Sequence, residues 1–203
     1  MTIGRGRAGG LAIGIAAFVA APPLSAATCM DSDPQAWLTS SAQRSLYIRL
    51  GGYLSCPDDP VDGPLADRIA CNYFVGKVLE AEYGVADFVR PSGGWLTANE
   101  ISAKVAAPAS GWSRIGSATS QQTLRRAAAA ADEGAPVIAV RTGAPGHVAL
   151  ILPGVLRRSG NWDLDVPNSA SFALGAVERA YVFCRLSYAF ASPSGVVLYR
   201  RDQ

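Results

Sequence analysis

The chain has 203 residues but only one histidine, His147, and four cysteines with no paired-cysteine motif. These are too few ligands for a typical zinc centre, so we expect no metal and no cofactor. No basic run occurs and the formal net charge is +2, which argues against a nucleic-acid partner. The chain also has no Gly-x-Ser-x-Gly elbow, and its Gly/Pro segment at 143–146 lacks the lysine of a phosphate-binding loop.

The N-terminus has the pattern of an export signal. Arginines precede an apolar stretch at residues 11–21, and small residues at 25–27 are typical of a signal-peptidase site. The apolar stretch is shorter than the ~20 residues of a spanning helix. We therefore expect a signal peptide over 1–27 and one domain over 28–203. The processed chain is expected to be periplasmic or extracellular, with no stable membrane insertion.

Export places the cysteines where disulfides persist. Two disulfides would use all four cysteines and leave no reactive thiol. If Cys71 is free, Cys29 and Cys56 form the natural pair, because both lie outside the expected helices and strands. Cys184 then lies buried in an apolar strand. The sequence leaves the pairing open.

Hydrophobic periodicity predicts helices in the first half of the domain and strands in the second. The expected helices cover residues 33–50, 66–83, 101–105 and 121–133. The expected strands cover residues 137–140, 147–152, 162–166, 180–186 and 196–200. This order predicts an α+β fold with N-terminal helices packed on a C-terminal antiparallel sheet.

Two residues have the chemistry of a thiol hydrolase. Cys71 falls in the first turns of the second expected helix, where the helix dipole favours a thiolate. His147 begins an expected strand, at a sheet edge where it can act as a base. Taken separately, each has a plainer interpretation, as a bonded or buried cysteine and as a surface histidine at a turn.

Together the two segments resemble a known family. Cys71-Asn72-Tyr73-Phe74-Val75 opening a helix, with Gly146-His147-Val148-Ala149-Leu150-Ile151 on a later strand, is similar to the paired signature of the NlpC and CHAP groups of cell-wall cysteine peptidases and amidases. The resemblance covers roughly residues 67–168. It implies a papain-like fold, Cys71 as nucleophile, His147 as base, and cleavage of peptidoglycan stem peptides or cross-bridges. Ala70 stands where the NlpC group often has aspartate, so the subgroup stays open.

The family places a third polar residue on the strand after the histidine strand. A hairpin turning near residues 158–159 would bring Asn168 or Ser169 opposite His147, and Asn168 is the expected orienting residue. Asp165 and Asp163 are the alternatives. The backbone N–H of Cys71 is the expected first oxyanion donor, and the second is not identified.

The expected function is an exported cysteine hydrolase whose partner is peptidoglycan or its peptide fragments, with any proteinaceous inhibitor left open. Three tryptophans, Trp95, Trp112 and Trp162, either line a groove for this polymer or belong to the core. Two other functions remain: a non-catalytic cell-wall peptide-binding module on the same fold, and a disulfide-stapled secreted interaction protein. The state of Cys71 distinguishes these alternatives.

Overall fold

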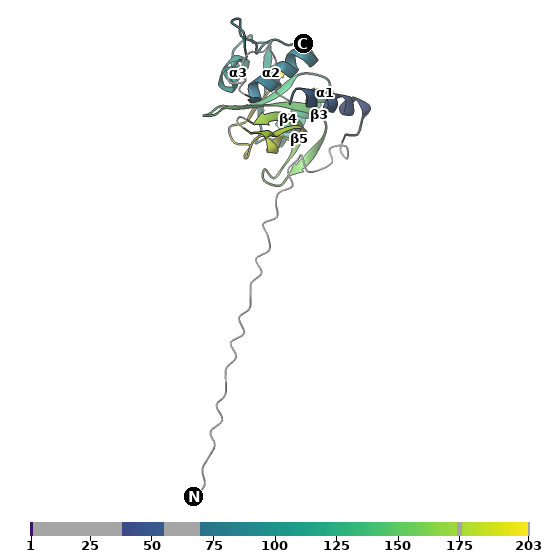
Figure 1. Cartoon of the computed structure of the whole chain (residues 1–203), viewed down its shortest axis with the longest axis vertical. Coiled ribbons are helices and arrows are strands. Elements are labelled where there is room, and N and C mark those ends of the chain that lie inside the picture. Colours follow the sequence, from purple (N-terminus) through teal and green to yellow (C-terminus); the bar gives the residue numbers. More distant parts are fainter. Residues whose placement is uncertain (2–37, 55–69, 174–175, 203) are drawn as a thin grey trace.

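The computed structural model describes residue 1 and residues 38–54, 70–173 and 176–202 (Figure 1). The expected export signal, Cys29 and Cys56 lie outside these residues. The elements are α1 Ser41–Gly52, α2 Ala70–Tyr83, α3 Ala98–Ala106, β1 Trp112–Ser117, α4 Gln121–Asp132, β2 Val137–Arg141, β3 His147–Ser159, β4 Leu164–Ala173, β5 Ala176–Arg185, the 3-10 turn η3 Leu186–Tyr188 and β6 Val197–Arg201.

Side-chain caps set where the helices begin. Thr97 and Glu100 form a capping box at the start of α3, and Ser120 accepts a hydrogen bond at the start of α4. A second box, between Ser40 and Gln43, starts α1. The expectation of a continuous helix over residues 33–50 is therefore wrong at 38–40, because the Ser40 cap holds an extended backbone there.

The strands form one antiparallel sheet in the order β1-β6-β2-β3-β4-β5. The α+β class and the antiparallel sheet are confirmed. The simple order of helices followed by strands is not, because β1, which we did not predict, precedes α4. Within the described residues, no helix has both the length and the apolar character to cross a membrane.

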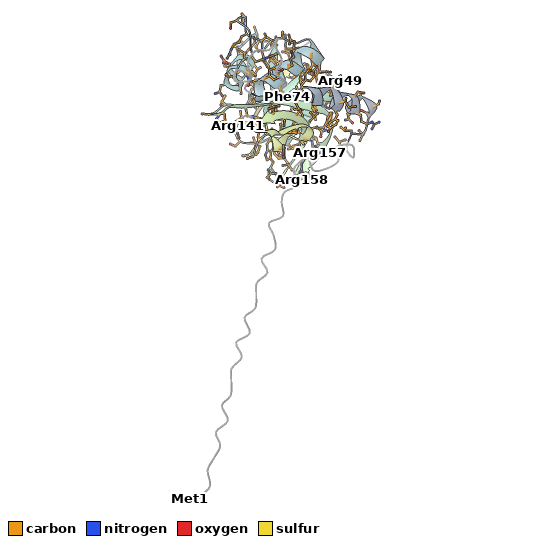
Figure 2. The ribbon with its side chains drawn as sticks, viewed as in Figure 1. Met1, Arg49, Phe74, Arg141, Arg157 and Arg158 are labelled. Atoms are coloured by element: carbon orange, nitrogen blue, oxygen red, sulfur yellow. The ribbon has the colours of Figure 1, made fainter. Side chains whose placement is uncertain are left out.

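Helices cover both faces of the sheet. On one face, the even-numbered side chains of β3, such as Val148 and Leu150, share a core with α1, α2 and α3. On the other, Ala149 and Ile151 share a core with α4 and with Phe190, which follows η3. Figure 1 shows α1, α2 and α3 gathered beside the strands, and Figure 2 shows Phe74 of α2 within the body of the protein. Alternation along β3 therefore decides which helices each side chain meets.

Candidate functional site

His147 is the first residue of β3, as predicted, and pairs with Arg141 of β2. Its ring lies edge-on against Phe190, with centroids 5.1 Å apart. Its Nε2 atom lies 2.8 Å from Ser171 Oγ on β4. These contacts place the imidazole on the α4 face of the sheet, at the end where β3 begins.

The surroundings of His147 keep its imidazole neutral. Burial and, to a lesser extent, the positive charge of Arg141 lower the pKa of His147 to about 4. Near neutral pH the ring is therefore unprotonated, and its low pKa makes it a weaker base than an ordinary imidazole. His147 is therefore not an imidazolium that could form an ion pair with a thiolate before the reaction.

Ser171 also orients the imidazole. Its hydroxyl lies 3.2 Å from the Val148 carbonyl oxygen and has only one proton to donate. When that proton goes to the carbonyl, Nε2–H of His147 donates to Ser171 Oγ and the lone pair of Nδ1 is left free. No hydrogen bond to Nδ1 is formed within the described residues. In that arrangement Nδ1 is the nitrogen that can act as the base.

Cys71 is the second residue of α2, close to a helix N-terminus as predicted, while its side chain lies outside the described part of the structure. The separation of the sulfur from His147 therefore stays a prediction. The next residue, Asn72, is buried and donates to the Leu96 carbonyl at 2.7 Å.

Contacts connect the start of α2 with the start of β3. Leu96 directly precedes the cap of α3, and Asn99 in the first turn of α3 donates to the Gly143 carbonyl at 2.9 Å. Asn99 also lies so close to Gly146 that a Cβ there would be 2.4 Å from its Oδ1. Gly146 directly precedes His147, so the helix start and the histidine lie at the same end of the sheet.

The C-terminal end of α2 lies farther along β3, away from His147, as expected if the helix begins near the histidine. Glu82 and Tyr83 line a hollow together with Pro153, which lies six residues beyond His147 on β3. A helix of this length spans about 20 Å, and six strand residues also span about 20 Å. The helix therefore runs back along the sheet toward His147.

The helix α2 and the His147 ring lie on opposite faces of the sheet, which limits where Cys71 and His147 could meet. The apolar side chains of α2 pack on the face opposite to the His147 ring. A reaction between Cys71 and His147 therefore requires them to meet around the end of the sheet, where the loop at 142–146 and α3 lie. Two groups on opposite faces farther along the sheet could not meet.

Asn168 is not the residue that orients His147. It pairs with Leu152, five residues along β3, and its side chain lies beside Gln43 of α1 on the other face. The hairpin turn lies later than expected, at residues 160–163, and a register shift separates Leu152 from Arg157. Asn168 Nδ2 donates to the Pro153 carbonyl, while its buried Oδ1 has no hydrogen-bond partner in the described part of the chain.

The other residues that we expected in the site make contacts that stabilise the fold instead. Asp163 forms an ion pair with Arg158 at the hairpin, and the backbone of Asp165 exchanges hydrogen bonds with Gln121 of α4. The tryptophans are core residues: Trp95, Trp112 and Trp162 are all buried. Their indoles contact the protein interior and offer no exposed groove.

Sequence reasoning missed Ser171, although one signal was present. Ser169 and Ser171 alternate with Ala170 and Phe172, a polar and apolar pattern that continues β4 beyond the expected end at residue 166. Both serines are buried, and Ser169 Oγ lies 3.0 Å from the Tyr181 hydroxyl. Extending that strand would have placed Ser171 on the same face as His147.

Cys184 is disulfide-bonded. The expectation that it is merely buried is therefore wrong, and its partner is Cys29, Cys56 or Cys71, since the chain has no other cysteine. A Cys29–Cys56 bond would leave only Cys71 for Cys184. The expected Cys29–Cys56 pair and a free Cys71 thus exclude each other.

No protein-family model and no curated protein sequence matches the chain. Within the described residues, no group of three or more His, Cys, Asp or Glu side chains is placed to hold a metal ion.

Proposed function

We propose that this protein is an exported cysteine amidase or peptidase of papain-like, NlpC/CHAP-type design that cleaves amide bonds in peptidoglycan peptides. Cys71 is the nucleophile, His147 the base, and Ser171 the residue that orients His147. The observation that carries the proposal is the hydrogen bond between His147 and Ser171 at the end of the sheet where α2 begins. The low pKa keeps the imidazole neutral, and the contact of Nε2 with Ser171 leaves Nδ1 without a hydrogen-bond partner among the described residues.

The proposed reaction begins with transfer of the Cys71 thiol proton to His147 Nδ1. The sulfur attacks the amide carbonyl, and the backbone N–H of Cys71 donates to the resulting oxyanion. His147 returns its proton to the leaving amine, which departs and leaves a thioacyl enzyme. Water, deprotonated by His147, then releases the carboxylate product and restores the thiol.

The neutral state of His147 determines when the Cys71 thiol is deprotonated. Because burial and Arg141 oppose the imidazolium, the thiolate forms as the proton moves to His147 during attack. The positive end of α2 stabilises the developing negative charge on sulfur. Activity therefore depends on both groups together.

Digestion of purified peptidoglycan tests the proposal. The protein is expected to release peptide fragments, identified by mass, whereas Cys71→Ala with an unchanged circular dichroism spectrum releases none. A Cys184→Ser variant controls for general loss of a cysteine and should keep activity in proportion to its folded fraction. Equal fragment release by the parent and Cys71→Ala would contradict the assignment of the nucleophile.

A second candidate, a disulfide-stapled secreted interaction protein, is favoured by the bond at Cys184. In that case Cys71 belongs to a disulfide and the His147–Ser171 pair serves only to satisfy buried polar groups. Peptide mapping of the unreduced protein separates the two candidates, because only the enzyme requires a free Cys71.

A further inference from the structure

A hollow of about 420 Å³ lies between α4 and the edge of the sheet formed by β1 and β6. It is separated from the His147 site, since β6 and β2 lie between β1 and β3 in the sheet. Three arginines from three different elements line it: Arg114 of β1, Arg126 of α4 and Arg200 of β6. Its volume is within the range of small-molecule sites.

The three guanidinium groups have no partner among the residues that the structure describes. None has a hydrogen bond, an ion pair or a ring contact within the described residues. Elsewhere arginines pair with acids: Arg49 with Glu82, Arg90 with Glu100 and Arg201 with Asp87. The contrast with Arg201 is sharpest, because it directly follows Arg200 on β6 yet is fully engaged on the other side of the strand.

Acidic groups in the hollow neutralise the arginines only in part. Glu133 and Asp202 also line it, but neither forms an ion pair with them within the described residues. Asp202 Oδ2 instead accepts a hydrogen bond from Ser113 Oγ at 2.8 Å. Three arginines against two acids leave the lining with a net positive charge, and its guanidinium donors remain open.

The backbone places Arg126 and Arg200 on the side of the sheet where the hollow lies, whereas Arg114 pairs with Tyr199 of the other face and reaches the hollow from the edge strand β1. Ser113 pairs directly with Arg200 across β1 and β6, and Ile115 of β1 packs against the core that α4 shares with the sheet. Guanidinium groups present planar forks of N–H donors that match the oxygens of carboxylate and phosphate groups. Open forks at one hollow are therefore suited to an oxyanion.

We propose that this hollow binds a ligand carrying an oxyanion, either a carboxylate or a phosphate, through Arg126 and Arg200. The site is independent of the proposed amide hydrolysis, since none of its residues belongs to that site. Because the arginines are at least partly exposed, binding weakens as the salt concentration rises.

Titration calorimetry with the purified protein tests this site, with inorganic phosphate and succinate as separate probes at constant ionic strength. Saturable binding of at least one probe is expected, and the preferred probe identifies the type of oxyanion. Arg126→Gln should weaken binding about tenfold, as expected for loss of one charge-assisted hydrogen bond. Arg126→Lys should recover part of the affinity, because it restores the charge but not the fork.

Arg125→Gln is the matched control. Arg125 is the neighbouring residue on α4, equally without a partner among the described residues, and it does not line the hollow. It should bind both probes with the affinity of the parent. Arg200→Gln provides a second variant from another element and should also weaken binding. Absence of saturable binding to both probes, or equal losses in Arg125→Gln and Arg126→Gln, would overturn the proposal.

Discussion

The two faces of the sheet differ in the side chains they bury. The face under α1, α2 and α3 is filled mainly by large apolar groups, including Phe74 and Leu150. The face under α4 adds a set of buried polar groups, in which Ser171 contacts His147 and Ser169 contacts Tyr181. Most buried polar groups in proteins have a hydrogen-bond partner, as these serines do. The comparison assigns stability mainly to the first face and the proposed chemistry to the second.

The largest expected effect is on the polar face. His147→Ala should lower kcat/KM on peptidoglycan by about 10²–10⁴-fold, because the proposed base is lost. Any loss of stability must be measured separately, because the ring also contacts Phe190 and Ser171. Turnover of labelled peptidoglycan, with circular dichroism as the folding control, measures both quantities. Turnover near that of the parent would remove His147 from the mechanism.

The apolar face should give the opposite result. Phe74→Ala should lower the free energy of unfolding by about 3–5 kcal/mol, because Phe74 is fully buried and its removal leaves a cavity. Urea unfolding measures the change. Ile48→Ala, at a residue of α1 that is 72% exposed, is the control and should stay within about 0.5 kcal/mol of the parent. Similar losses in both variants would show that α2 does not form the core as described.

Ser171 and Asn168 lie on opposite faces of the same strand, β4, and therefore allow the two faces to be compared. Ser171→Ala should lower kcat about tenfold with little change in KM, because an unheld imidazole spends less time in the productive tautomer. Asn168→Ala should leave kcat unchanged and affect only stability, because its side chain contacts Pro153 on the other face. Steady-state kinetics of the two variants gives the comparison, and a larger kcat loss in Asn168→Ala would reverse the assignment.

The last effect concerns the pH dependence of stability. His147 has a pKa of about 4 when folded, against an ordinary value near 6.5 when unfolded. Between these values the unfolded chain binds more protons, so the contribution of His147 to stability rises from pH 4 to pH 6.5 and is complete above that range. Thermal unfolding of the parent minus that of His147→Gln should show this rise. A flat difference would mean that the folded imidazole titrates normally.

Local signals in the sequence predicted much of the fold. Thr97 with Glu100, Ser120 and Gly84 set helix ends through short-range hydrogen bonds or a positive φ, so neighbouring residues suffice to find them. The strand that begins at His147 was found from its apolar run. β1 was missed because its pattern is broken by a register shift between Arg114 and Gly116.

The site was harder to predict because it depends on register. The sequence indicates that the third residue lies on the next strand, but not where the hairpin turns. Extension of β3 to Ser159 moved the turn and brought Leu152, not His147, opposite Asn168. Ser171 contacts His147 only through this non-local pairing. The bond at Cys184 is likewise a long-range contact that spacing does not reveal.

The central claim is that Cys71 is a free thiol that reacts through His147. Iodoacetamide labelling of the unreduced protein near neutral pH, followed by peptide mass mapping, tests it most directly. We predict rapid labelling of Cys71, much slower labelling in His147→Ala, and a disulfide joining Cys184 to Cys29 or Cys56. A disulfide between Cys71 and Cys184 would contradict the account.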